Sequence, residues 1–175
     1  MSTGSTIATI GRLSLSFGET LLTDIKPDRF ARLPEGQVGL IPTNHPAWAY
    51  GHLGLYGSAV CSMLGEDEAA KELAAPEDWD PLFKAGATCQ DDPEGSLYPD
   101  MKAITEQFIR SMNGMLACAE RADDAVFLQT TPIERMRERF PTIGVAVTFM
   151  AGSHAMLHLG QVSAWRRIEG LGSAM

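Results

Sequence analysis

Residues 144–165 read GVAVTFMAGSHAMLHLGQVSAW and contain no charged side chain. Val147, Ala151, His154, His158 and Trp165 recur in this stretch at spacings of three, four and seven residues, which is typical of one face of an α-helix. The two histidines are four residues apart, so their rings lie on the same face one turn apart, where one metal ion can bind both. The alternative is that they are two core histidines satisfied by hydrogen bonds.

Three further segments show a helical pattern of apolar residues. The first covers about residues 6–24. The second begins at Pro46, a residue suited to the first position of a helix, with His45 or Asn44 as its cap. It continues to about residue 64, where Gly65 ends it.

Prolines also mark where the third and fourth helical segments begin. The third segment begins at Pro99, and the fourth runs from Pro141 to about residue 169, where Gly170 and Gly172 stop it. No series of strands rich in Val, Ile and Thr is evident. We therefore predict an all-α four-helix bundle that forms one domain over residues 1–175.

The connections add detail to this bundle. Residues 65–98 are long enough to cross the whole bundle, so the second and third helices can run parallel and give an up-down-down-up order. Trp79, Leu82 and Phe83 are the expected anchors of this connection. Later in the chain, Thr131-Pro-Ile-Glu134 resembles a capping box and predicts a short extra helix through residue 139.

Charge excludes one class of partner. The net charge is −8, which disfavours a nucleic-acid-binding surface because phosphate neutralisation needs clustered Lys and Arg. Arg135, Arg137 and Arg139 form the single local basic cluster, but Glu134 and Glu138 interleave with them. We interpret this cluster as a solvated helix face.

The cysteines and the N-terminus bear on location. Cys61, Cys89 and Cys118 are odd in number and scattered, which favours thiols in a reducing cytoplasm over a disulfide scaffold. The first residues lack the basic flank and apolar block of a signal peptide. No uninterrupted apolar run approaches the roughly 20 residues that span a bilayer. The sequence predicts a soluble cytoplasmic protein without a membrane partner.

A third histidine completes a candidate metal site. His52 lies two turns into the second helix, and facing helices of a bundle can bring side chains to one ion. Three imidazoles leave a coordination position open, as in catalytic sites, and suit Zn, Ni, Cu or Fe. His45 lies about 10 Å further along the helix axis than His52. One ion therefore cannot bind both, and we interpret His45 as a helix-start residue.

Gln161 lies near the same face as His154 and His158. It has two possible roles: a hydrogen bond between helices, or orientation of a histidine ligand. We expect Gln161 and His45 to support the ligands rather than to bind the ion.

Four motifs occur in order along the chain: Asn44-His-Pro-Ala-Trp48, Gly51-His52-Leu53, His154-x-x-x-His158-x-Gly160-Gln161 and Trp165-Arg-Arg167. Together they resemble the motifs of the DinB/YfiT-like superfamily of metalloenzymes. The resemblance implies an up-down-down-up bundle, often dimeric, with a divalent metal ion at the positions of His52, His154 and His158. Characterised members include S-transferases and isomerases that use a bacterial low-molecular-weight thiol as cosubstrate.

Two classes of function follow. The first is a metal-dependent transferase that moves a thiol onto a small electrophilic molecule, or a hydrolase that uses water at the same open position. The second is a non-catalytic bundle that binds a metal or a ligand. Fold and metal alone do not separate them. A pocket with a positioned acid or base beside the open position would favour the enzyme, whereas a sealed apolar site would favour the structural role.

Overall fold

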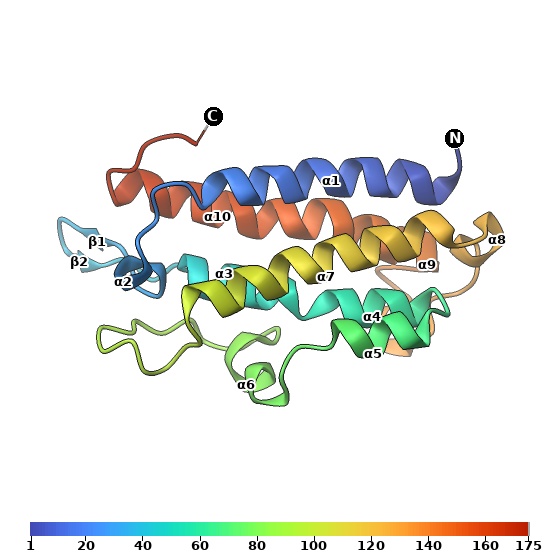
Figure 1. Ribbon diagram of the computed structural model, residues 1–175, viewed down its shortest axis with the longest axis horizontal. Helices are drawn as coiled ribbons and strands as arrows, with labels where there is room; N and C mark the ends of the chain where they lie inside the picture. The colour runs from blue at the N-terminus through green and yellow to red at the C-terminus, as the bar shows by residue number, and fades with distance from the viewer. Residues whose placement is uncertain (175) are drawn as a thin grey trace.

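The computed structural model describes residues 1–174, and its elements form a four-helix bundle (Figure 1). The first helix is α1 (Thr3–Leu21). The second is α3 (Pro46–Gly54) continued by α4 (Tyr56–Met63), the third is α7 (Met101–Arg121), and the fourth is α9 (Ile143–Thr148) continued by α10 (Ala155–Ile168). The remaining elements are α2 (Pro27–Phe30), β1 (Glu35–Gly36), β2 (Gly39–Leu40), α5 (Asp67–Leu73), η1 (Glu77–Trp79), α6 (Asp80–Phe83), α8 (Asp124–Phe127), η2 (Glu134–Met136) and η3 (Phe149–His154).

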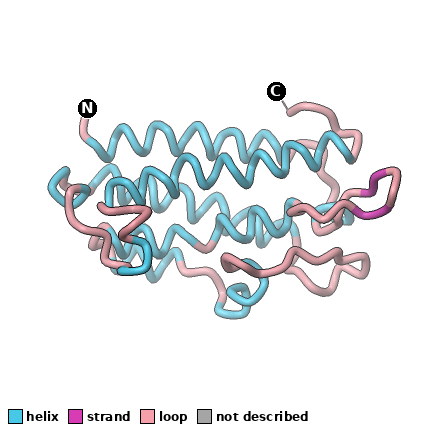
Figure 2. The backbone as a smooth tube through the Cα atoms, turned by 180° about the vertical axis from the view of Figure 1, so that it is seen from behind, coloured by secondary structure: helices cyan, strands magenta, loops and turns pink. Residues whose placement is uncertain are grey.

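The direction of the helices follows the predicted up-down-down-up order. Figure 1 shows α3, α4 and α7 running the same way, opposite to α1 and α10. Helix α1 packs against α7 and α10, and α3 packs against α7 and α10, which closes the bundle. The antiparallel strands β1 and β2 form a small hairpin at one end (Figure 2). The all-α fold class is thus confirmed.

The predicted helix starts are partly right. Pro46 does open α3, with His45 as its cap. The other two helices begin two residues after the predicted prolines, because a better cap follows each proline. The Asp100 side chain accepts from the Ala103 N–H at 2.8 Å, and the Thr142 hydroxyl accepts from the Val145 N–H at 3.4 Å. A cap side chain satisfies an N–H that has no partner within the helix, which proline cannot do.

The fourth helix is not a continuous α-helix. Its middle, Phe149–His154, is a π-helical turn, and the residues that precede it are rotated relative to those that follow. The whole stretch Ile143–Ile168 has 26 residues and a hydropathy of 1.3 in its most apolar window, so by length and composition alone it would suit a membrane span. Half of that window is buried inside the bundle, as in the core helix of a globular protein.

The core lies where the four helices meet. Its fully buried side chains include Phe108 and Met112 of α7 and Leu159 and Trp165 of α10. Methionine fills irregular space between helices well, which suits the apolar face of α7. The three-histidine cluster described below lies beside this core, between α3 and the junction of the π-helical turn with α10.

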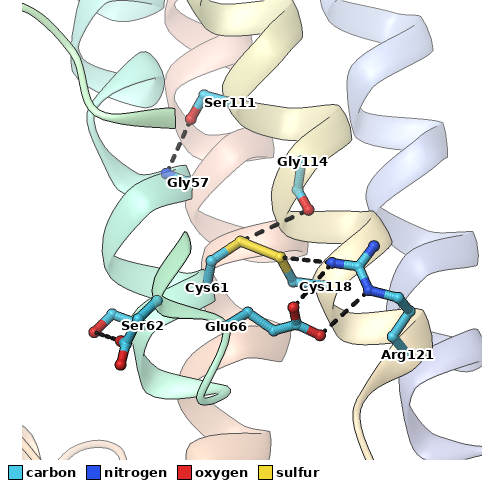
Figure 3. The surroundings of a disulfide bond; sticks show 9 residues. Gly57, Cys61, Ser62, Glu66, Ser111, Gly114, Cys118 and Arg121 are labelled. Carbon is cyan, nitrogen blue, oxygen red and sulfur yellow. Dashed lines mark hydrogen bonds and ion pairs between the residues drawn. A yellow bond between two sulfur atoms is a disulfide. The ribbon is translucent and has the colours of Figure 1, made fainter. Parts of the chain in front are cut away.

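The cysteine prediction was wrong for two of the three residues. Cys61 of α4 and Cys118 of α7 are buried and form a disulfide, with their Cα atoms 5.7 Å apart (Figure 3). Gly57 explains how the two helices come so close. Its N–H donates to the Ser111 hydroxyl at 2.9 Å, and a Cβ there would lie 2.5 Å from that oxygen. The sequence pattern could not show this pairing, because the two residues are 57 apart.

The connection at residues 65–98 does cross the bundle and is folded onto it. Trp79 and Phe83 are buried and Leu82 is partly buried, as expected of its anchors. The capping-box prediction was wrong. The buried Thr131 hydroxyl donates to the Phe140 carbonyl at 2.6 Å instead of capping a helix, and only a single 3₁₀ turn, Glu134–Met136, follows it.

Candidate metal centre

Three histidines from two distant segments converge at one point. His52 lies in α3, His154 ends the π-helical turn and His158 lies in the first turns of α10. One ring nitrogen from each lies within 4.8 Å of the other two. His52 and His158 are buried, whereas His154 is partly exposed. The structure therefore brings together the three residues that the sequence proposed as ligands.

The crossover connection orients the ring of His52. Its Nδ1–H donates to the Phe83 carbonyl oxygen at 2.6 Å, so Nε2 is unprotonated and its lone pair faces His154 Nε2. Gly51 makes this contact possible, because a Cβ at this position would lie 2.4 Å from the Phe83 ring. The glycine next to the histidine thus lets Phe83 pack closely enough for its carbonyl to reach the imidazole.

Gln161 orients His158 in a similar way. The His158 Nδ1–H donates to the Gln161 Oε1 at 2.9 Å, and the Asn44 amide donates to the same oxygen at 3.0 Å. The Asn44 bond fixes the glutamine from the start of α3. Metal-binding histidines usually donate their second ring N–H to such an acceptor, which sets the tautomer and the ring orientation. Gln161 thus bonds a candidate ligand, His158, and a residue of the segment that leads into α3.

The distance between two of the three nitrogens fits a single ion. His52 Nε2 and His154 Nε2 lie 3.1 Å apart. Two imidazole nitrogens at the usual distance from one Zn²⁺ would be about 3.0–3.4 Å apart, depending on the coordination angle. Because His52 and His158 direct Nε2 away from their hydrogen-bond partners, the donor set suits a borderline divalent cation such as Zn, Ni or Fe.

The rings are neutral at physiological pH. Burial disfavours the charged form and lowers the pKa of His52 to about 4 and that of His154 to about 3. Nearby histidines lower both values further. Burial also lowers the pKa of His158, against an opposing effect of its bond to Gln161. Neutral imidazoles have the lone pairs that metal binding requires.

His45 does not reach the cluster. Its Nδ1 accepts from the Trp48 N–H at 3.2 Å, and its Nε2–H donates to the Gln90 carbonyl at 2.9 Å. Both nitrogens are thus occupied, as expected of a helix-start residue. Trp48 connects it to the candidate ligands, because the Trp48 indole stacks on His52 with ring centres 4.7 Å apart.

The cluster opens into a cavity of about 590 Å³. Tyr56 lines this cavity and makes edge-on ring contacts with His52 and His154, at centroid distances of 5.0 and 4.9 Å. Burial, followed by the charge of Asp80, raises the pKa of Tyr56, while Arg135 lowers it, so the phenol stays protonated at neutral pH. Sequence reasoning missed Tyr56, although it lies one turn after His52 and therefore shares its face.

The three arginines of the basic cluster are exposed, as predicted, but they do not lie on a regular helix. Arg135 and Arg139 line the same cavity, whereas the Arg137 Nε–H donates to the Thr131 carbonyl at 2.9 Å. Because the backbone is irregular around the 3₁₀ turn, the three arginines do not share one helix face. Two of its three arginines have side chains at the candidate site.

Comparison with known proteins agrees with this geometry. No curated protein and no solved structure gives a significant match to the chain. The model of the DinB superfamily matches residues 19–162, which include all three clustered histidines and Gln161. The bundle order and the histidine cluster fit a metal-binding protein of this kind, and the chain belongs to the DinB superfamily.

Proposed function

We propose that His52, His154 and His158 bind one divalent metal ion, and that the protein is a metal-dependent transferase that moves a thiol onto a small electrophile. The observation that carries this proposal is the way in which the histidine rings are oriented beside a cavity. Two of the histidines are held by carbonyl or amide oxygens on their Nδ1 side, and the cluster borders a cavity large enough for a small molecule.

The residues around the cluster suit this chemistry. A bound divalent cation would supply a Lewis acid that lowers the pKa of a thiol or of water at the open position. Tyr56 has a protonated phenol beside two of the histidines and can donate a hydrogen bond to a substrate oxygen. Phe149 and Met150 contribute apolar walls that exclude bulk water from part of the cavity.

The non-catalytic alternative is a bundle that binds a metal for stability alone. The cavity beside the histidines and the protonated Tyr56 favour the enzyme over this alternative. A metal-dependent hydrolase remains the second candidate, because water can occupy the same open position as a thiol. We further propose that the protein acts as a homodimer in the cytoplasm, as the family resemblance and the sequence composition suggest.

The test measures metal and thiol separately. Native mass spectrometry should find one divalent ion per chain in the wild-type protein and none in the His154→Ala/His158→Ala double variant. His45→Asn, which lies outside the cluster, serves as the matched control and should keep the metal. Stoichiometric metal in the double variant would exclude the site.

Cobalt then reports the chemistry. A thiol that binds cobalt-loaded protein should produce a sulfur-to-metal charge-transfer band, and conjugation to an electrophile should require the metal. Absence of the band with every thiol tested, together with metal-dependent ester hydrolysis, would instead identify a hydrolase. Absence of both activities would favour the non-catalytic role.

A further inference from the structure

Two arginines at the cavity have no acidic partner among residues 1–174. Arg135 and Arg139 are exposed and line the cavity next to the histidine cluster. Within residues 1–174, no carboxylate lies within ion-pair distance of either side chain. The guanidinium of Arg139 lies 5.4 Å from the ring centres of Phe140 and Phe149, which hold its planar group against the cavity wall. Two unpaired guanidiniums beside one cavity form a site for an anion.

The charge of the side chains that line this cavity is positive, whereas the net charge of the protein is negative. The chain carries a net charge of −8, yet the described residues that line the cavity include no Asp or Glu. The acidic group that acts on Tyr56 is Asp80, and its carboxylate pairs with Lys84 at 3.7 Å. A positive cavity on an acidic protein attracts a negatively charged substrate to one place and repels it from the rest of the surface.

Trp48, at the wall of the cavity, has a buried hydrogen-bond donor without a partner among residues 1–174. Trp48 lines it with only 5% of its surface exposed, and its indole N–H has no acceptor among the described residues. Its ring stacks on His52 and lies 5.7 Å from the His158 ring. A buried N–H without an acceptor costs free energy, and a ligand oxygen would remove that cost.

From these features we infer that the substrate of the proposed reaction is a small organic acid. Its carboxylate binds Arg135 and Arg139, and a second oxygen accepts from the Trp48 indole N–H beside the histidines. Free phosphate would neutralise the charge of the two arginines. It would, however, leave most of the cavity and its apolar walls at Met136 and Met150 without contact. The inference rests on the proposed function, because it names the substrate class of that same site.

The test uses nuclear magnetic resonance of the three indole N–H groups, with and without added zinc. The chain has three tryptophans, and the Trp48→Phe variant assigns the relevant signal. Succinate is the anionic probe, its neutral diamide is the uncharged control, and inorganic phosphate tests for a bare anion site. Succinate should shift the Trp48 signal downfield and leave the other two unchanged.

Arginine variants then locate the carboxylate. Arg135→Met and Arg139→Met should each weaken succinate binding by about tenfold, the usual effect of losing one charge-assisted hydrogen bond. Arg167→Met removes the same charge from an exposed site on α10, where the Arg167 side chain donates to Ser163 of its own helix. This variant should bind succinate as the wild type does.

Three results would overturn the inference: equal binding of succinate and its diamide, tighter binding of phosphate than of succinate, or arginine variants that match the wild type. Failure of the proposed function looks different. It appears as absence of metal in native mass spectrometry while the arginine-dependent shift of the Trp48 signal persists.

Discussion

Acid should destabilise this protein through His45, a residue outside the histidine cluster. Its side chain is completely buried, and burial lowers its pKa from 6.5 to about 4. A proton on Nδ1 would also remove the acceptor that the Trp48 N–H uses. The folded state therefore resists protonation of His45, while the unfolded chain accepts a proton at the ordinary pKa.

The sign and size of the effect follow from linkage. Above pH 6.5 His45 is neutral in both states, so it adds no pH dependence. As the pH falls from about 6.5 toward 4, only the unfolded state binds the proton, and stability falls. At about pH 5 the two pKa values give a loss of about 2 kcal/mol from this single residue. Below about pH 4 both states bind the proton and the loss levels off.

Urea unfolding of wild-type protein and His45→Asn, at pH 7.5 and at pH 5, measures this loss. Asparagine keeps a cap acceptor for the Trp48 N–H but carries no titratable ring. At neutral pH the variant should be less stable, because it loses the bond to the Gln90 carbonyl and leaves a small cavity. Between pH 7.5 and pH 5 the free energy of unfolding of the variant should fall by about 2 kcal/mol less than that of the wild type. Identical pH dependence in both proteins would refute the reasoning.

Two further substitutions test how the candidate ligands are held. Gln161→Leu removes the acceptor of the His158 Nδ1–H and should weaken metal affinity by about 10–100-fold, measured by competition with a chelator. Gly51→Ala would place a Cβ 2.4 Å from the Phe83 ring, so we expect a loss of about 1–3 kcal/mol in urea unfolding and weaker metal binding.

Each of these substitutions has a matched control. Gln161→Glu keeps an acceptor for the His158 ring and should retain the metal affinity that leucine loses. Gly160→Ala adds the same methyl group at an exposed position of α10 where no heavy atom lies within 4 Å, and should stabilise the helix by about 0.5–1 kcal/mol. If Gly51→Ala and Gly160→Ala had the same effect on stability and metal binding, the packing of Phe83 on Gly51 would not matter to the site.

The helices and the histidine cluster were predictable because local patterns encode them. Apolar spacing located the four long helices, and the i, i+4 relation of His154 and His158 placed both rings on one face. Helix starts were less predictable, since a proline and a cap such as Asp100 are neighbours and each indicates a different first residue of the helix. The π-helical turn before His154 has no signature in the spacing of apolar residues.

Contacts between distant segments escaped prediction for a different reason. The Cys61–Cys118 disulfide depends on how α4 and α7 pack, which the cysteine count does not reveal. The expectation of a cytoplasmic protein rested partly on unpaired cysteines and stays a prediction. Likewise, the place of Arg135 and Arg139 at the cavity was not predicted, because a regular helix was assumed where the chain makes one 3₁₀ turn.

The crossover connection shows how chain order and site chemistry are coupled. Because α3 and α7 run parallel, the chain between them must return along the bundle, and it passes the start and middle of α3. Two of its carbonyls accept from histidines there, Phe83 from His52 and Gln90 from His45. Each bond fixes which ring nitrogen carries the proton. The connection demanded by the topology thereby determines that His52 presents an unprotonated Nε2 to His154 and the cavity.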